Sequence, residues 1–511
     1  MTLTKNLFQS DSIALSLGVN MSASIAQRGL GFARGIILAW LVSQGEFGLL
    51  GVALMVANLL MPICTVGLYE GIARYAPYHE SGRTLLGFAV RSLLLTVGIA
   101  AAVTAILFVP AEAVGRFLFS AGTAATGQTG TDVAPPDPGA LTRAVLICVF
   151  TMAPFHAVMA LLKGLRMFRA LSLMELTVAL LFTLLAIGGA WAGLATARSV
   201  MIAYAVSNLV SVVVFAPGLL RSISSSSGIE KRTNGDQRTL RSTLLAFSAW
   251  AGGTAILRHV TSCYPMWHLL KVSAQETVGT FHAVRMVTQL VGIGAVMLVS
   301  IVSANAARIW EHEGREPAVA RLVMWTKATL LGLFGAAVCL SVACPLIMRV
   351  LPRSFGEGVA AFDVMLLLFL LISFVLLIAV RVNLIEKPRM VFVAWAVGMV
   401  VSVIACCVLL GDPLGQTDAP VTGALQSTAW AGVVGIGAAA LTLLGLCARE
   451  SLAPTRSTLL LAVCCISVGF GWWLSVPVLA VVSLASCFTQ VIFTGKERAA
   501  LLSGLARFNV R

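Results

Sequence analysis

Several arginines stand inside long apolar stretches of this chain. Arg28 and Arg34 lie within the run 13–42, and Arg258 lies within the run 243–271. An arginine near the centre of a bilayer costs about 3–10 kcal/mol unless it reaches water, so it normally faces other protein groups or a wet cavity. A guanidinium also binds phosphate oxygens through two parallel hydrogen bonds. These residues predict a cationic cavity for an anionic substrate.

A second polar group follows helical spacing in the run 277–307. His282, Arg285 and Gln289 are three and seven positions apart, so a helix presents them as one stripe. The stripe favours a surface that faces the cavity, although a single membrane histidine is more often a packing residue. The predicted substrate-binding residues, for an anionic headgroup and its sugar, are therefore Arg28, Arg258, Arg285, His282, Gln289 and Arg34.

Two alternatives stay open at these positions. Each arginine can instead pair with an acid or with carbonyls of its own half of the protein. Arg34 follows Arg28 by six residues, which turns it about 120° away on an unbroken helix, so both need not face one cavity. Nearby glycines permit a kink that would bring the two together.

Acidic residues are placed differently from the arginines. Glu70 and Glu175 stand near predicted cytoplasmic ends and Asp363 near an outer end, so we expect no acid at the depth of Arg28. A proton- or sodium-coupled exporter of cationic drugs would be expected to carry such an acid. An arginine-lined cavity also repels cations. The pattern disfavours a multidrug exporter.

The composition requires lipid around the chain. Of 511 residues, 59% are hydrophobic and only 11% are charged, whereas a soluble domain has roughly 25% charged residues. One membrane crossing takes about 20 helical residues. We predict an all-α polytopic membrane protein with about 14 transmembrane helices, near residues 13–42, 47–73, 84–109, 141–162, 171–194, 197–220, 243–271, 277–307, 322–350, 359–384, 390–411, 421–447, 457–475 and 477–494.

Basic residues set the predicted orientation. Most of the 35 lysines and arginines fall in alternate loops or at the chain ends. By the positive-inside rule, both termini are cytoplasmic, and the net charge of +14 reflects topology rather than nucleic-acid binding. The basic group of Arg381, Lys387 and Arg389 follows the tenth span, on the cytoplasmic side. We interpret the basic hinges Leu161–Ala170 and Ile385–Met390 as topology anchors that attract anionic lipid, with capture of a pyrophosphate headgroup as the alternative.

The chain also carries signs of an internal duplication. The segment Ser43–Gly48 opens the second span and Ser273–Gly279 opens the eighth, and further pairs of segments recur in the same order. The predicted parts are an N-lobe of six helices (1–220), a cytoplasmic linker (221–241), a C-lobe of six helices (242–450), and two extra helices with a cytoplasmic tail (451–511). Such parallel repeats are typical of transporters that alternate access around a central cleft.

The same residues give little support to catalysis. We find no GxxxxGK[ST] phosphate loop and no paired nucleophile and base. The 11 cysteines fall mostly in apolar runs, where cysteine behaves as a small hydrophobe, and their spacing is not that of a metal site. We therefore expect a protein that is not an enzyme and that needs no cofactor or metal.

Three segments resemble a known family. They are Leu38–Leu41, Gly45–Gly48 and Gly67–Tyr75, and they are similar to the opening of Wzx-type polysaccharide flippases, the O-antigen and exopolysaccharide exporters of the multidrug/oligosaccharidyl-lipid/polysaccharide (MOP) superfamily. The similarity extends over about residues 10–450. The two extra C-terminal helices resemble larger members and the lipid II flippases, which leaves the subfamily open.

The resemblance implies a fold and a function. It implies a V-shaped, two-lobed helical protein of the bacterial inner membrane that flips an undecaprenyl-pyrophosphate-linked sugar unit. Its partners would be that lipid-linked anionic oligosaccharide, membrane lipids and a polysaccharide polymerase or export machinery, with no nucleic acid. The alternatives are a multidrug and toxin extrusion (MATE) exporter of the same superfamily and a membrane-embedded glycan polymerase or glycosyltransferase. The last would need a large outer loop, whereas residues 110–140 predict a short flexible one.

Overall fold

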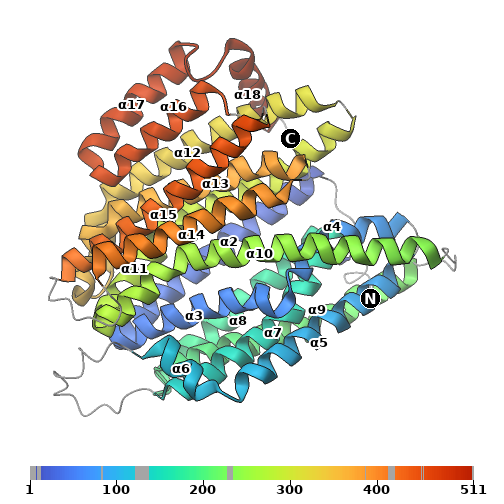
Figure 1. Ribbon diagram of the computed structural model, residues 1–511, viewed down its shortest axis with the longest axis vertical. Helices are drawn as coiled ribbons and strands as arrows, with labels where there is room; N and C mark the ends of the chain where they lie inside the picture. The colour runs from blue at the N-terminus through green and yellow to red at the C-terminus, as the bar shows by residue number, and fades with distance from the viewer. Residues whose placement is uncertain are drawn as a thin grey trace. The chain divides into compact units, whose positions relative to one another are not determined.

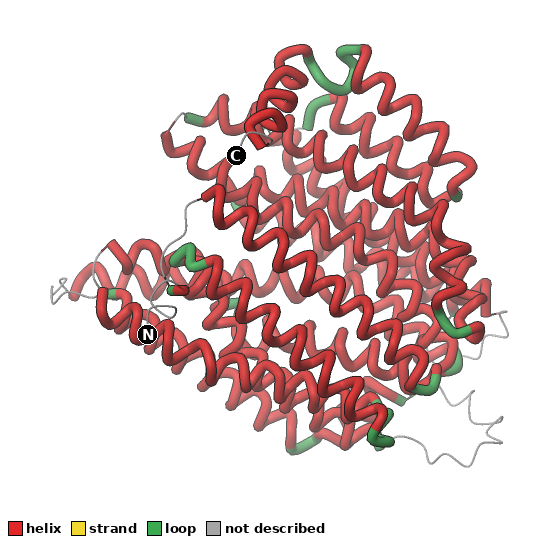
Figure 2. The backbone as a smooth tube through the Cα atoms, turned by 180° about the vertical axis from the view of Figure 1, so that it is seen from behind, coloured by secondary structure: helices red, strands yellow, loops and turns green. Residues whose placement is uncertain are grey.

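The computed structural model consists of helices joined by short loops (Figure 2). It describes residues 7–8, 13–81, 84–120, 137–226, 234–312, 314–385, 387–411, 421–450, 452 and 454–508, and no strand occurs within these ranges. Nine of the helices described there are long and apolar enough to cross a membrane. The predicted class, an all-α polytopic membrane protein, is confirmed.

The chain forms two compact units. The N-terminal unit comprises residues 1–282 with 411–418, and the C-terminal unit comprises residues 283–410 with 419–511. The helices of the N-terminal unit are α2 (Ile13–Leu41), α3 (Gln44–Thr65), α4 (Leu68–Ser81), α5 (Leu85–Phe108), α6 (Ala111–Phe119), α7 (Pro138–Gly164), α8 (Phe168–Trp191), α9 (Ala197–Ser226) and α10 (Asn234–Val272) (Figure 1).

Helix α11 (Gln275–His312) begins in the N-terminal unit and continues into the C-terminal unit. The C-terminal unit then contains α12 (Arg315–Val350), the 3-10 turn η2 (Arg353–Gly358), α13 (Val359–Leu384), α14 (Pro388–Leu410), α15 (Val421–Arg449), α16 (Arg456–Cys465), η3 (Ile466–Phe470), α17 (Trp472–Phe488) and α18 (Gly495–Phe508). The predicted division of the chain into an N-lobe and a C-lobe, joined by a linker at 221–241, stays a prediction.

The N-terminal unit is built around α7, which packs against α3, α4, α5, α6 and α9. Ile72, Leu161 and Leu219 are fully buried in the apolar core that α4, α7 and α9 share. Two helices complete the unit: α2 packs along α8, and α10 packs along α3 and α4. These two contacts place the predicted arginines beside particular side chains.

The C-terminal unit is built around α13, which packs against α12, α14 and α15. Helices α14 and α15 approach closely because glycines face the contact. A Cβ on Gly398 would lie 2.9 Å from the Gly435 carbonyl oxygen, and one on Gly435 would lie 2.5 Å from the Ser402 Cβ. The extra helices α16 and α17, with η3, pack on this core.

The second predicted span, 47–73, is not one continuous helix. Helix α3 ends at Thr65, and Val66 and Gly67 follow with φ values of 49° and 65°. A Cβ at Gly67 would lie 2.4 Å from the Ser248 carbonyl oxygen of α10, so only glycine fits at this crossing. The chain breaks where two helices cross, which a run of apolar residues does not reveal.

Three further boundaries differ from prediction. The outer loop 110–140 begins with helix α6, and its residues 121–136 lie outside the described part of the chain. The linker 221–241 is helical over 221–226 and 234–241, because α9 and α10 extend beyond their apolar cores. The last two spans divide at Gly471, where φ is 100°, rather than at Pro477, which lies within α17.

Candidate functional site

Arg34 is held by aromatic rings rather than by an acid. Its Cζ lies 3.8 Å from the ring centroid of Phe182 on α8. The Phe182 ring stacks in turn on Tyr204 of α9, with 4.6 Å between centroids and 19° between planes. A cation over an aromatic face contributes about 0.5–2 kcal/mol. The half-buried guanidinium therefore ends a three-layer stack built from α2, α8 and α9.

Arg28 lies on the same helix but in a different setting. Its side chain is exposed, and its guanidinium interacts electrostatically with the Glu175 carboxyl of α8 and with the Tyr204 phenol. Tyr204 interacts with Arg34 as well. The helical rotation between the two arginines does not separate them, because Tyr204 lies near both.

The position of Glu175 differs from the expectation that acids stand away from the arginines. Helices α2 and α8 pack side by side, which brings the half-buried Glu175 within electrostatic reach of Arg28. Lys163 at the end of α7 also interacts with this carboxyl. An acid therefore accompanies one of the predicted cations.

Arg258 lies on α10, against a different group of side chains. Helix α10 packs on α4, and the half-buried Arg258 interacts electrostatically with Tyr69 of that helix. The Tyr69 ring lies 6.0 Å from the imidazole of His156 on α7, measured between centroids. Arg258 thus belongs to the same compact unit as Arg28 and Arg34, beside a second tyrosine.

His282 is packed against α3. A Cβ on Gly51 would lie 2.4 Å from His282 Cγ, so the imidazole fills the notch that this glycine leaves. The Phe47 ring adds a contact at 5.0 Å between centroids. Helix packing explains this histidine, and its predicted contact with substrate stays a prediction.

Arg285 and Gln289 continue on α11 within the C-terminal unit. They are four residues apart, share one helix face and are both half-buried. The neighbouring face of α11 packs on α13, because Thr288 Oγ1 lies 3.8 Å from Met365 Sδ and a Cβ on Gly292 would lie 3.0 Å from Phe369 Cδ1. The role of Arg285 and Gln289 in binding stays a prediction.

The segment Gly45–Gly48, one of the family-like motifs, and the preceding Gln44 have a structural role. Gln44 Nε2 donates to the Glu276 carbonyl oxygen at 3.0 Å and to Thr280 Oγ1 at 2.7 Å. Glu46 Oε2 accepts from the Ala197 backbone N–H at 2.7 Å and so caps the start of α9. These contacts join the starts of α3, α9 and α11.

Sequence reasoning missed two aromatic members of the arginine environment, Phe182 and Tyr204. Neither stands out in an apolar run, since aromatic residues there are usually core. The available signal was the arginine itself, because a half-buried guanidinium is stabilised by an aromatic face as well as by an acid or carbonyls. Within the described residues, no three His, Cys, Asp or Glu side chains gather as metal ligands would.

Comparison with known proteins gives the fold. No family model and no curated protein sequence matches the chain. Among solved structures, the lipid II flippase MurJ in an inward closed conformation matches with a TM-score of 0.62 and 15% identity, covering 91% of this chain and 97% of that one.

Two other solved structures match in the same way. A MOP superfamily transporter from Pyrococcus furiosus, whose reversed binding-pocket polarity suggests a different function, has a TM-score of 0.63 and 14% identity over 88% of this chain and 98% of its own. An inward-facing MATE transporter of the MOP superfamily has a TM-score of 0.60 and 13% identity over 85% and 98%. At these identities the likeness shows that the chain has the MOP transporter fold.

Proposed function

We propose that this chain is a lipid-linked oligosaccharide flippase that moves an anionic, polyprenyl-pyrophosphate-linked sugar unit across the membrane by alternating access. One observation carries the proposal: two guanidiniums on an apolar helix, the exposed Arg28 and the half-buried Arg34, both interact electrostatically with Tyr204 of α9. Cations are retained in such a place at a cost, which an anionic substrate would explain. The fold shared with a lipid II flippase supports this.

Arg28 and Arg34 would have different roles in binding the substrate. The exposed Arg28 can offer its planar fork to pyrophosphate oxygens, with bidentate hydrogen bonds. Arg34 is held on the Phe182 ring, so its charge is positioned without an acid that would neutralise it. Arg258 and Arg285 would add further positive charge. The sugar would contact polar residues such as Gln289, and the polyprenyl tail would remain in lipid.

The setting in the cell follows from the same proposal. The flippase would lie in a bacterial inner membrane with both termini in the cytoplasm, and would deliver its substrate to a polysaccharide polymerase or export machinery. No covalent step is assigned to the chain. The positive-inside pattern of its loops supports the orientation.

A MATE-type exporter of cationic compounds is the second candidate. Glu175 favours it, because this half-buried carboxyl lies within electrostatic reach of Arg28 and belongs to the helix bundle. In an exporter, protonation of such an acid would drive release of a cation. The flippase function therefore requires the charge of Arg28, whereas the exporter function requires the carboxyl of Glu175.

Matched charge-neutralising variants separate the two functions. Arg28→Gln and Glu175→Gln are expressed in cells that lack the chromosomal copy, with Arg91→Gln as the control. Arg91 is also an exposed arginine, but on α5. Surface glycan and ethidium efflux are measured at equal protein levels.

The flippase predicts that Arg28→Gln lowers surface glycan about tenfold or more, since truncating a charged hydrogen-bonding partner costs about 2–5 kcal/mol. Arg91→Gln should leave glycan unchanged. The exporter predicts instead that Glu175→Gln abolishes ethidium efflux and that Arg28→Gln leaves glycan intact. Intact surface glycan in Arg28→Gln would overturn the proposed flippase function.

A further inference from the structure

Arg381 has a position that its sequence context does not suggest. It was predicted to be one of the basic residues that follow the tenth span on the cytoplasmic side, yet it lies inside α13, three residues before the helix ends at Leu384. Only 2% of its surface is exposed. Arg381 therefore does not follow the span as predicted, because the helix continues past it and neighbouring helices cover it.

The buried guanidinium has two donors without acceptors. Nε and Nη2 of Arg381 are both buried and make no hydrogen bond. These two N–H groups lie on one edge of the planar guanidinium and point the same way, which is the edge that receives an oxyanion with two parallel hydrogen bonds. The electrostatic neighbour of Arg381 is the Cys447 thiol on α15, which is only a weak acceptor.

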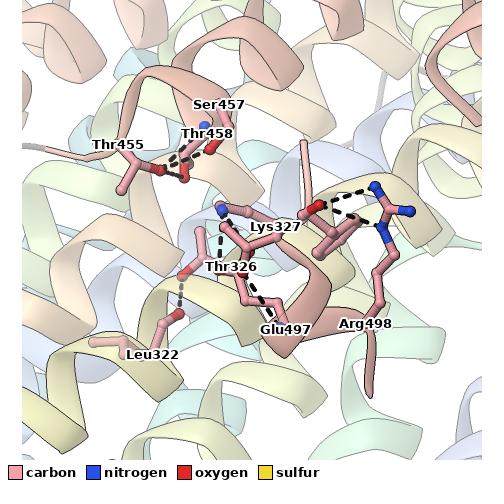
Figure 3. A network of polar contacts seen from close by, with 10 residues as sticks. Leu322, Thr326, Lys327, Thr455, Ser457, Thr458, Glu497 and Arg498 are labelled. Atoms are coloured by element: carbon pink, nitrogen blue, oxygen red, sulfur yellow. Dashed lines mark hydrogen bonds and ion pairs between the residues drawn. The ribbon is translucent and has the colours of Figure 1, made fainter. Parts of the chain in front are cut away.

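The same unit contains a buried cation whose charge is satisfied. Lys327 on α12 has a side chain 4% exposed, and its Nζ donates to both carboxylate oxygens of Glu497, at 3.0 Å and 3.1 Å. Figure 3 shows this pair together with the carbonyl contacts of Arg498. Burying a charge without a partner is costly. Because no described side chain accepts from Nε or Nη2 of Arg381, the contrast with Lys327 favours an external anion as its partner.

Access to Arg381 requires the surrounding helices to move apart, because its Nε and Nη2 are buried. Among the described side chains, the adjacent apolar cluster contains Ala306 of α11, Leu322 of α12 and Val380 of α13, with Val299 and Leu384 packed against it. Two exposed cations, Lys387 and Arg389, follow α13, and Lys387 is bonded to Glu450 at 2.6 Å.

We propose that the Nε–Nη2 edge of Arg381 is a phosphate-binding site, filled when the ends of α11, α12 and α13 around it part. The positive-inside pattern places this end at the cytoplasmic surface, where lipid phosphates are concentrated. The phosphate belongs either to an anionic phospholipid or to the pyrophosphate of a lipid-linked substrate. Only the second source rests on the proposed function.

The test uses the purified full-length chain in phosphatidylcholine nanodiscs. Three probes are added separately: inorganic pyrophosphate, undecaprenyl pyrophosphate and phosphatidylglycerol. The unfolding temperature and the binding affinity are measured for the wild type, Arg381→Met, Arg381→Lys and Arg449→Met. Arg449 is the matched control, because it is an exposed arginine at the end of α15.

We expect at least one probe to raise the unfolding temperature of the wild type and of Arg449→Met. Arg381→Met should bind that probe at least tenfold more weakly, and Arg381→Lys should bind it several-fold more weakly because an ammonium cannot make two parallel bonds. Without any probe, Arg381→Met should be at least as stable as the wild type, since it removes an unpaired buried charge. A merely structural arginine would give the opposite stability change.

The probes separate the two sources. An effect with both pyrophosphate probes assigns the site to the substrate, and an effect with phosphatidylglycerol alone assigns it to phospholipid. Binding of every probe by Arg381→Met with wild-type affinity, or no response of the wild type to any probe, would overturn the proposal. Neither of these outcomes affects the glycan measurement on Arg28→Gln, so failure of this site and failure of the proposed function are distinguishable.

Discussion

The cations of the two compact units have different surroundings. In the N-terminal unit, Arg28 is exposed and Arg34 is half-buried, and a carboxyl and two aromatic rings surround them. In the C-terminal unit, Lys327 is buried with a carboxylate and Arg381 is buried without one. Cations in apolar helices therefore differ in their exposure and in the groups that surround them. The exposure of a cation and its partner decide whether it can meet a ligand.

The largest expected effect concerns Lys327. Lys327→Met removes one partner of a largely buried ion pair and leaves the Glu497 carboxylate with hydrogen bonds from Thr494. It should therefore lower the free energy of unfolding by about 3 kcal/mol. Lys387→Met is the matched control, because its pair with Glu450 is exposed at 48% and 39%, and it should cost about 0–1 kcal/mol. Denaturation of both purified variants measures the difference. Equal losses of unfolding free energy in the two variants would contradict the expected difference between the buried and the exposed ion pair.

A smaller effect is expected at the contact between Gly51 and His282. Gly51→Ala places a Cβ against the imidazole and should cost about 1–3 kcal/mol through overpacking. The double variant Gly51→Ala/His282→Ala should recover part of that loss, because the clash is removed. Thermal unfolding of the single and double variants measures this. No recovery would mean that His282 is not the packing partner, and would return it to the candidate binding residues.

The stack at Arg34 should contribute less. Arg34→Gln removes the cation over Phe182 and should lower the free energy of unfolding by about 0.5–2 kcal/mol. Arg28→Gln, on the same helix but exposed, should change stability by less than this while still reducing transport. Paired stability and glycan measurements on the two variants test the comparison. The expected order of stabilities is wrong if Arg28→Gln destabilises the protein more than Arg34→Gln does.

The smallest effect is a dependence of stability on pH. Burial acts to raise the pKa of the Glu497 carboxyl, but hydrogen bonds from Thr494 and Lys327 outweigh it, and the pKa lies below its ordinary value of 4.5. Because the folded-state pKa is depressed, the stability from this carboxylate is complete above about pH 4.5 and is lost as the pH falls through the lower value. The stability difference between the wild type and Glu497→Gln should follow this course. A difference that grows on acidification would contradict it.

Much of the architecture could be predicted from local patterns. Every predicted span overlaps a helical segment, because an apolar run of bilayer length identifies a helix without reference to its neighbours. Prediction failed where a neighbour intervenes. The break at Gly67 depends on the Ser248 carbonyl of another helix, and the extension of α9 and α10 into the linker carries little apolar signal.

The candidate site could be predicted only in part. Arg28 and Arg34 were identifiable because a charge in an apolar run is conspicuous. Their surroundings were not, since Glu175 and Tyr204 come from α8 and α9 and meet the arginines only through helix packing. Arg381 shows the reverse error: it was predicted to follow the tenth span on the cytoplasmic side, yet it lies inside α13 and tertiary contacts bury it.

The sequence by itself determined the lipid environment, the all-helical class and the presence of positive charge within the bundle, because composition and apolar run length act locally. The tertiary structure decided which charges have partners. Lys327 and Glu497 are 170 residues apart, and Gln44 and Thr280 are 236 apart. No local pattern encodes such distances, because a side chain's partner depends on which helices pack together and at what depth they cross.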